Sequence, residues 1–495
     1  MINPSQSRVG AFLNSDKKII RGVEKENLRS NARGEISNKS FPESLGNHHF
    51  NKFVTLDYSE PHLELVTPTF DNNHDLFEFL QQLHSYVEKR LDGDILWNYS
   101  MPPVFNKELI TLPDAGITNK SKLAYLYRLG LRNRYGDKMQ STAGIHFNIS
   151  FSKTFIKNIG IDKNEFYLGI ARNFMRLFPV ALRLTGSSPV THCSFLKGRD
   201  LHVEKLGDEN CYLPKSTSLR VSRLGYYSEE QDKNFITFNS LNEYLEIMSR
   251  YMNKPNEKFS HISSTSEKYE QVNNGTIQME SELYNHIRPK AKQTNLRQYL
   301  QLQETGIDYL EIRSIDLNPF SKIGITQNDL FFWEAFIFYC AVCDSPPISS
   351  IEIESIKENI RRASEAGQEC NLIAGFDQAN AEIDIKELTS NFLNSMRASI
   401  KEVSSEDLYD QMFEEFENRN NHPISAQVIE STLKKGNIIS FIKEHSQHIS
   451  LKNNQKFHKL FEEEKAKSIN NFQAHLSSDK LEFDEFIKKF REETK

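Results

Sequence analysis

Acidic residues, one histidine and one arginine recur in short segments of the sequence that are otherwise apolar. They are Glu24, Glu26, Asp57, Glu64, His146, Glu311 and Arg313. In an extended strand, positions i and i+2 point to the same side, so this alternation sends each ionisable group to the face opposite its apolar neighbours. Glu64, for example, stands between Leu63 and Leu65, which must face an apolar layer. Four strands would then direct their charged groups into one shared space.

Carboxylates gathered on one face of a sheet favour the binding of a cation. Like charges brought together repel one another and lose hydration unless something neutralises them. Mg²⁺ does so with hard oxygen ligands, and it commonly shares those ligands with phosphates. Five carboxylates, one imidazole and an adjacent guanidinium therefore predict a metal–nucleotide site for phosphoryl transfer, at which Arg313 would steady the charge on the transferred group.

A second interpretation of the same pattern is that these are ordinary antiparallel strands with one solvated face. Any one pair of residues taken alone favours that interpretation, whereas four such segments together favour the metal–phosphate site. The sequence contains neither a P-loop nor a GxGxxG motif, so the common glycine-rich loops that bind nucleotide phosphates are absent.

Strand and helix signals alternate irregularly along the first three quarters of the chain. Apolar residues at helical spacing predict helices over 76–90 and 166–183, and β-rich runs predict strands over 54–57, 63–67, 144–150 and 308–315. Because strands and helices do not alternate regularly as in βαβ units, this mixture indicates the α+β class with a mostly antiparallel sheet. From about residue 376 the pattern becomes almost wholly helical. We therefore expect a catalytic α+β domain over 1–375 and a helical region over 376–495 packed on it.

The composition of the chain limits which partners it can bind and in which compartment it is expected. The chain has 495 residues, with 61 basic against 67 acidic side chains, so it has no basic excess for nucleic acid or anionic lipid. The longest apolar run, 331–343, is too short to span a bilayer and predicts a buried core helix. No apolar signal segment is recognisable at the N-terminus, so we expect a cytoplasmic protein that binds no membrane.

The cysteines and most histidines carry no recognisable site pattern. Five cysteines are too few and too scattered for a disulfide framework, and we interpret Cys340 and Cys343 as two buried core thiols. His48 and His49 have no acidic partner at ligand spacing, so we expect them to be surface or core residues.

Seven segments resemble the proteobacterial (type 1) glutamate–cysteine ligases, and they occur in family order between about residues 20 and 350. They are Arg21–Arg29, Ser100–Pro102, Tyr127–Gly136, Gly144–Asn148, Thr217–Tyr226, Glu282–Lys290 and Tyr309–Phe320. Beyond residue 375 the resemblance is one of length and helical character.

The resemblance implies a glutamine-synthetase-like fold, in which a curved, mostly antiparallel sheet forms a funnel packed with helices. It implies that ATP phosphorylates the γ-carboxylate of L-glutamate and that the amine of L-cysteine then attacks the acyl phosphate. The product would be γ-glutamylcysteine, in the first step of glutathione biosynthesis. We accordingly expect Mg²⁺, or Mn²⁺ in its place, with ATP as co-substrate. We also expect a monomer whose partners are small-molecule substrates, with no nucleic acid.

Roles for individual residues follow from the same resemblance. Glu311 and Arg313 would be catalytic, with Arg313 stabilising the transferring phosphate and the acyl phosphate. Arg128 is a further candidate for contact with glutamate or phosphate. The metal-binding set would be Glu24, Glu26, Asp57, Glu64, His146 and Glu311, and the cysteine pocket would be lined by Tyr127, Arg220, Tyr226 and Tyr284.

Two departures from the family pattern leave other functions open. Ser121 replaces a glycine and would strain or reshape its loop if that position needs a positive φ. Tyr58 replaces a common phenylalanine and could alter the polarity of the acceptor pocket. One alternative is therefore a γ-glutamyl ligase that uses a different amine. Another is a weakly active regulator that binds nucleotide or glutamate, although that would be marked by a lost metal ligand and all six are present.

Overall fold

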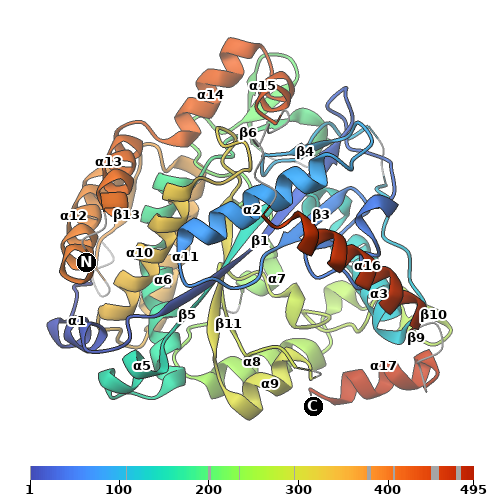
Figure 1. Cartoon of the computed structure of the whole chain (residues 1–495), viewed down its shortest axis with the longest axis horizontal. Coiled ribbons are helices and arrows are strands. Elements are labelled where there is room, and N and C mark those ends of the chain that lie inside the picture. Colours follow the sequence, from blue (N-terminus) through green and yellow to red (C-terminus); the bar gives the residue numbers. More distant parts are fainter. Residues whose placement is uncertain are drawn as a thin grey trace.

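An antiparallel sheet of seven strands runs through the middle of the molecule (Figure 1). Its strands are β1 (Ile19–Ser30), β2 (Val54–Leu56), β3 (His62–Val66), β4 (Ile95–Trp97), β5 (Gly144–Phe151), β11 (Ile287–Lys290) and β12 (Tyr309–Asp316). They lie in the order β11-β12-β5-β1-β3-β2, and β4 also pairs with β1. The predicted α+β class with an antiparallel sheet is confirmed.

The computed structural model describes most of the chain. The described residues are 2–106, 109–198, 202–233, 235–294, 296–375, 381–404, 407–446, 456–474 and 481–494. Every strand and helix predicted above is found among them, with ends that differ by no more than four residues. The predicted helix over 76–90, for example, begins earlier because the side chain of Asn72 accepts a hydrogen bond from the backbone N–H of Asp75 and caps α2 (Asn73–Glu88).

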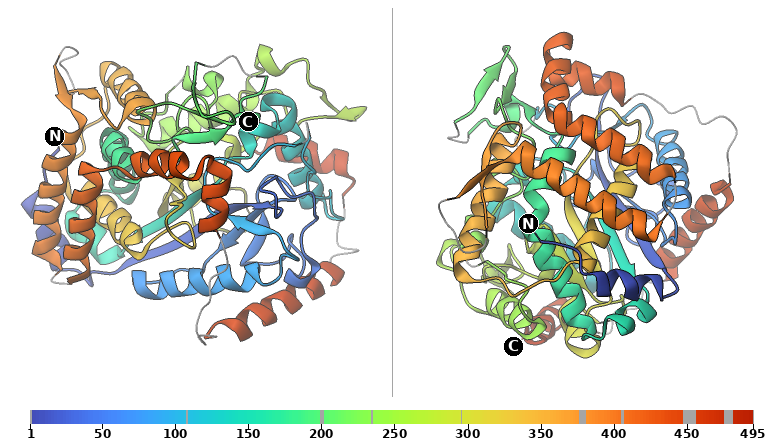
Figure 2. Two further views of the ribbon diagram at one scale, coloured as in Figure 1. Left: turned by 90° about the horizontal axis from the view of Figure 1, so that it is seen from above. Right: turned by 90° about the vertical axis from the view of Figure 1, so that its left-hand side faces the viewer.

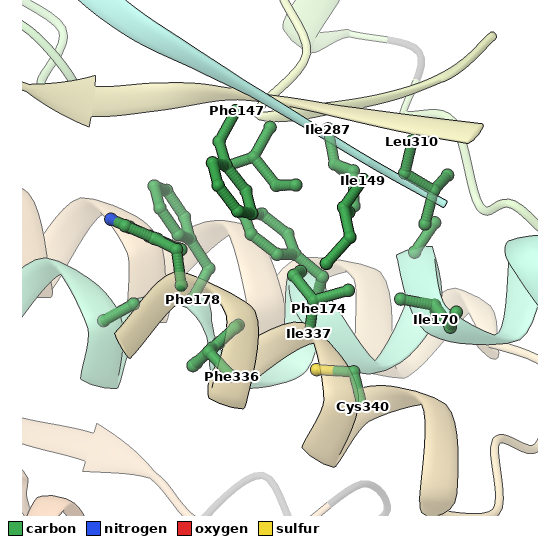
Figure 3. Packing of buried hydrophobic residues seen from close by; sticks show 14 of the residues in the cluster. Phe147, Ile149, Ile170, Phe174, Phe178, Ile287, Leu310, Phe336, Ile337 and Cys340 are labelled. Carbon is green, nitrogen blue, oxygen red and sulfur yellow. The ribbon is translucent and has the colours of Figure 1, made fainter. Parts of the chain in front are cut away.

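Helices α6 (Lys163–Thr185) and α10 (Gln327–Val342) cover one face of the sheet. Phe147 and Ile149 of β5 point down onto Phe174 of α6, and Phe336 of α10 lies beside it (Figure 3). All residues of α10 from Leu330 to Val342 are buried, so the prediction of a core helix over this apolar run is confirmed. Because side chains alternate along β5, the face opposite this apolar layer receives His146 and Asn148.

The remaining helices of the first 375 residues surround the sheet. They are α1 (Gln6–Leu13), α2, α3 (Asn119–Tyr135), α4 (Asp137–Gln140), α5 (Lys153–Ile159), α7 (Glu229–Asp232), α8 (Leu241–Asn253), α9 (Gln298–Thr305) and α11 (Ser350–Ala366). Small sheets are formed by β6 (Val190–His192), β7 (Glu204–Leu206) and β8 (Asn210–Tyr212), by β9 (Ser264–Thr265) and β10 (Lys268–Tyr269), and by β13 (Asn371–Ile373) and β14 (Glu382–Asp384). Helix α2 packs against β1 and β3.

The last part of the described chain is helical apart from β14. Its helices are α12 (Ile385–Val403), α13 (Asp407–Asn421), α14 (Ile424–Lys435), α15 (Ile438–His445), α16 (His458–Ala474) and α17 (Phe483–Glu492). They spread over the molecule and do not gather into a bundle (Figures 1 and 2). α12 and α13 pack near α10, α14 and α15 near β6, α16 on α2, and α17 on α3. The predicted domain boundary at residue 376 lies outside the described residues.

The cysteines are partly as expected. Cys340 and Cys343 are buried free thiols, as predicted, and burial raises the pKa of Cys343 to about 12. Cys193 and Cys211, in contrast, are joined by a disulfide. The pairing of β6 with β8 brings them together, with their Cα atoms 5.2 Å apart, which sequence spacing alone did not indicate. Within the described part of the chain, no helix has the length and apolar character needed to cross a membrane.

A buried ion pair joins the sheet to the core helix. Arg21 of β1 and Glu334 of α10 are 4 % and 5 % exposed, and the guanidinium donates a hydrogen bond to the carboxylate. The same carboxylate accepts hydrogen bonds from Asn73 Nδ2 at 2.9 Å and from the Tyr409 hydroxyl at 2.6 Å. One side chain therefore connects β1, α2, α10 and α13.

We expect Glu334→Ala to lower the free energy of unfolding by about 3–5 kcal/mol, because it leaves a buried guanidinium without its partner. Urea unfolding measures this loss. The matched control is Glu369→Ala, which removes an exposed carboxylate paired with Lys215 and should cost no more than about 1 kcal/mol. Equal losses in the two variants would contradict the role assigned to Glu334.

Candidate active site

The registers of the central strands bring the predicted ionisable residues together. Glu24 of β1 stands opposite His146 of β5, and Glu26 stands opposite Glu64 of β3. On the other side of β5, Glu311 of β12 stands opposite Asn148. All six residues predicted as a metal-binding set line two adjoining cavities. Asp57 and His146 border both cavities, Glu26 borders one, and Glu24, Glu64 and Glu311 border the other.

His146 lies at the centre of the acidic group. Its Nδ1 is 3.2 Å from Glu24 Oε2, and its Nε2 is 3.2 Å from Glu26 Oε1. Candidate ligand atoms of Glu24, Glu64 and His146 all lie within 4.8 Å of one another, close enough to bind one ion. Glu24 also accepts a hydrogen bond from Asn148 Nδ2 at 3.1 Å, and Glu26 accepts one from the Gly144 N–H at 2.7 Å. These bonds orient the carboxylates in advance.

The acidic group carries more negative charge than its surroundings neutralise. Burial and the neighbouring carboxylates of Glu24 and Asp57 raise the pKa of Glu64 well above its ordinary value. Burial and Glu26 likewise raise the pKa of Asp57. Burial alone would lower the pKa of His146, but Glu26 and Glu24 raise it to about 9. Protons held in this way mark a place where a divalent cation would be stabilised instead.

A basic group adjoins the acidic one on the far side of β5. Arg313 Nη1 donates to Glu311 Oε2 at 3.0 Å, Lys290 Nζ lies 3.5 Å from Glu311 Oε1, and Arg288 Nη1 lies 3.8 Å from Glu311 Oε2. Although burial opposes ionisation, these three cations hold the pKa of Glu311 well below its ordinary value. The strand register shifts between Ile312 and Ile315, so a β-bulge presents Arg313 at this point.

Arg288 and Lys290 were not singled out from the sequence. They stand at i and i+2 on β11, the same alternation that selected the other residues. The four-residue strand contains Pro289 and leads into a polar segment, so its apolar face is too short to mark it. The alternation Arg-Pro-Lys was nevertheless a usable signal.

The predicted cysteine-pocket residues divide between the two cavities. Arg220, Tyr226 and Tyr284 line one of them, with the two tyrosine rings 4.2 Å apart between centroids. The Tyr284 hydroxyl accepts a hydrogen bond from Gln140 Nε2 at 3.0 Å. Tyr127 lines the other cavity, beside Glu64 and Arg288, and Tyr226 borders both.

Arg220 reaches the site across the backbone of Gly144. A Cβ atom at Gly144 would lie 2.1 Å from Arg220 Nη2, so only glycine leaves room for the guanidinium. Nη2 donates to the Arg313 carbonyl at 3.1 Å, while the buried Nε makes no hydrogen bond. The guanidinium therefore retains capacity for an anionic group in the cavity.

Arg128, unlike Arg220, uses its guanidinium to hold the backbone beside the site. Its Nε and Nη2 donate to the carbonyls of Asp57 and Leu56, at 2.7 and 2.8 Å. It borders the cavity, but these bonds make it a residue that positions Asp57.

The structure places both residues at which the sequence departs from the family pattern. Ser121 lies in the first turn of α3 and forms a capping box with Thr118, so the expected loop strain is absent, and the positive φ of this loop falls on Gly116. The hydroxyl of Tyr58 donates to the buried carboxylate of Asp137, which also accepts from Arg132. Tyr58 borders the cavity, but its polar end is engaged by Asp137.

The expectation that His48 and His49 lack an acidic partner is wrong, although both side chains are largely buried, as core residues would be. Both rings lie beside the carboxylate of Asp114, which is distant in sequence but adjacent in the fold.

Comparison with known proteins agrees with this geometry. The sequence model of the glutamate–cysteine ligase family matches residues 11–363. The glutamate–cysteine ligase of Wigglesworthia glossinidia brevipalpis is 33 % identical over 457 residues, which are 88 % of this chain and 90 % of the relative. That of Alcanivorax borkumensis is 35 % identical over 390 residues, which are 74 % of each chain. The crystal structure of the Francisella tularensis glutamate–cysteine ligase in complex with AMP superposes with a TM-score of 0.90, at 26 % identity, and covers 96 % of this chain and 98 % of that one.

The chain therefore has the fold of a ligase, an enzyme that joins two molecules. The chain belongs to the glutamate–cysteine ligase family.

In the metal-free protein, we expect the contribution of His146 to stability to fall as pH rises. The folded state holds its proton up to a pKa of about 9, whereas the unfolded state releases it near 6.5, so the contribution is complete below pH 6.5 and is lost as pH rises through 9. The shift corresponds to about 3 kcal/mol. The test compares the free energies of unfolding of wild type and His146→Asn in chelator from pH 6.5 to 9.

The difference between the two proteins should shrink by about that amount over this range. His422→Asn serves as a control, because that histidine is half exposed beside an exposed glutamate. A difference between wild type and His146→Asn that grew with pH would contradict the assignment.

Proposed function

We propose that this protein joins the γ-carboxylate of L-glutamate to the amine of L-cysteine with ATP, through a γ-glutamyl phosphate. The product is γ-glutamylcysteine, and the reaction is the first step of glutathione biosynthesis. The observation that supports this most strongly is the contiguous arrangement of an acidic group, a basic group and an arginine–tyrosine cavity on one sheet face. The family match and the AMP complex of the Francisella tularensis ligase support a nucleotide as one substrate.

The acidic group suits Mg²⁺, or Mn²⁺ in its place. Its ligand atoms are mostly carboxylate oxygens, which such hard cations prefer, and the raised pKa of Glu64 reflects negative charge that a cation would neutralise. When bound, the ion would offset charge on the phosphate oxygens of ATP. The residues that would hold it are Glu24, Glu26, Asp57, Glu64, His146 and Glu311.

The basic group suits the transferred phosphate. Arg313 is held by Glu311 and by the β-bulge, and its buried Nε makes no hydrogen bond within the protein. A fixed guanidinium can donate two parallel hydrogen bonds to phosphate oxygens without reorganising. Lys290 and Arg288 add charge on the same side, so the acyl phosphate of glutamate would form between the acidic and basic groups.

The arginine–tyrosine cavity suits the acceptor amino acid. Arg220 would pair with the carboxylate of cysteine, and the hydroxyls of Tyr226 and Tyr284 would donate hydrogen bonds to it. This cavity adjoins the acidic group through Asp57 and His146, so the bound amine would face the carbonyl carbon of the acyl phosphate. Tyr127 would contact the acceptor from the neighbouring cavity.

We infer further that residues 1–375 form the catalytic part and 376–495 a helical region that stabilises it. Helices α12, α13, α15 and α16 contribute side chains to the apolar clusters of the catalytic part, which favours one cooperative unit. The expected setting is the cytoplasm, where the protein would act as a monomer on small molecules.

We expect cysteine-dependent release of ADP from ATP in the presence of Mg²⁺ and glutamate. Glu311→Gln should lower kcat by at least about 100-fold, because it removes a predicted metal ligand and the partner of Arg313. Glu369→Gln removes an exposed carboxylate and should leave the rate unchanged.

Faster ADP release with 2-aminobutyrate or a simple amine than with cysteine would assign a different acceptor. Nucleotide binding without turnover on any acceptor would make the protein a regulator.

Arg220→Lys tests the acceptor cavity. We expect KM for cysteine to rise about 10–100-fold with little change in KM for glutamate, because lysine cannot reproduce the paired hydrogen bonds to a carboxylate. Steady-state kinetics with each substrate varied in turn measure this difference. Arg223→Lys, which alters an exposed neighbour paired with Glu365, is the matched control. An equal rise in both KM values would argue against a specific role in acceptor binding.

A further inference from the structure

Two adjacent histidines and an aspartate meet outside the proposed active site. His48 and His49 lie in the turn before β2, and Asp114 lies in the loop before α3. His48 Nε2 is 3.7 Å from Asp114 Oδ2, and His49 Nε2 is 3.5 Å from Asp114 Oδ1. One ligand atom from each residue lies within 4.8 Å of the other two.

The distances from the two histidine Nε2 atoms to the Asp114 oxygens are similar to those between neighbouring ligand atoms of one metal ion. Zinc binds imidazole nitrogen and carboxylate oxygen at about 2.0–2.2 Å, so neighbouring ligands of a tetrahedral site lie about 3.4 Å apart. The observed distances exceed those of a good hydrogen bond. The side chain of His49 is only 12 % exposed, and its buried Nε2 atom makes no hydrogen bond. An unpaired buried polar atom of this kind is costly and is explained by a missing partner.

The backbone holds the three side chains in place. The N–H of His49 donates to Asn47 Oδ1 at 3.0 Å, the carbonyl of His48 accepts from Thr55 Oγ1 at 3.0 Å, and the two imidazole rings lie 3.9 Å apart. Asp114 Oδ1 accepts from the N–H of Gly116 at 2.6 Å, in a loop where Gly116 has a φ of +57°. The carboxylate of Asp114 is otherwise exposed, so an ion can enter from solvent and water can complete its coordination.

The ionisation states also suit a metal. Burial, with a contribution from His49, lowers the pKa of His48 to about 4, and burial lowers that of His49, so both rings are neutral at pH 7. Metal ions bind only the neutral imidazole. The positive charge that acts on both rings, Arg128, donates Nε and Nη2 to the carbonyls of Asp57 and Leu56.

We propose that His48, His49 and Asp114 form a second metal site, separate from the carboxylate-rich one. Two imidazoles and one carboxylate suit Zn²⁺ or Co²⁺, whereas Mg²⁺ prefers oxygen ligands alone. The ion would join the turn before β2, which leads to Asp57, to the loop before α3, which carries Tyr127. It would thereby hold together two segments that lead to residues lining one cavity of the proposed active site.

The test is a titration of the full-length protein with Co²⁺, in the presence of excess Mg²⁺ to occupy the carboxylate-rich site and without substrates. Visible absorption and calorimetry report binding. The variants are Asp114→Asn, which changes an exposed side chain without altering its shape, and His49→Gln. His422→Gln is the matched control, because His422 stands 3.3 Å from Glu430 without a second histidine.

We expect one Co²⁺ per chain in wild type and in His422→Gln, displaced by Zn²⁺, with affinity at least about tenfold weaker in Asp114→Asn and in His49→Gln. Absence of binding in the Mg²⁺ background, or unchanged affinity in either variant, would overturn the proposal. Equal thermal stability of all four proteins in chelator verifies that the variants fold. Because no substrate is present, this result is independent of whether the proposed ligase activity is found.

Discussion

The whole polar site depends on the pairing of β5 with β1 on one side and with β12 on the other. These registers set Glu24 opposite His146 and Glu311 opposite Asn148, and they hold the apolar residues between them against α6 and α10. A shift of one residue in either pairing would send the ionisable groups into the apolar layer. The buried Phe147 and Ile149 therefore specify the position of the site as firmly as the charged residues do.

Net negative and net positive charge gather in different parts of this site. Glu24, Glu64 and Asp57 gather beside His146, and burial with neighbouring carboxylates raises the pKa of Glu64 and of Asp57 there. Arg313, Arg288 and Lys290 surround Glu311. Such an arrangement costs stability in the empty protein, because neither group is neutralised by the other. It becomes favourable when a cation and a phosphate are bound together, which is the physical basis for relating this geometry to phosphoryl transfer.

Helices far along the chain stabilise the elements that carry these residues. Tyr409 of α13 donates to Glu334, which in turn pairs with Arg21 of β1, and Glu462 of α16 accepts from Tyr86 and Arg90 at the end of α2. The described residues of the last hundred thus help to hold these elements in place, and none of them lines the two cavities that hold the predicted site residues. This distribution accounts for their helical pattern, which carries no recognisable site motif.

The sequence by itself determined which residues share a strand face, because alternation is a local property of an extended chain. Alternation thereby identified the six acidic and histidine residues of the polar face. The apolar run over 331–343 identified the core helix, and the mixture of strand and helix signals identified the α+β class. Only the tertiary structure decided which strands are neighbours, that Lys290 and Arg288 approach Glu311, that Ser121 caps a helix, and that Asp114 lies beside His48 and His49. These contacts join segments distant in sequence, and packing of the core, rather than any local pattern, brings such segments together.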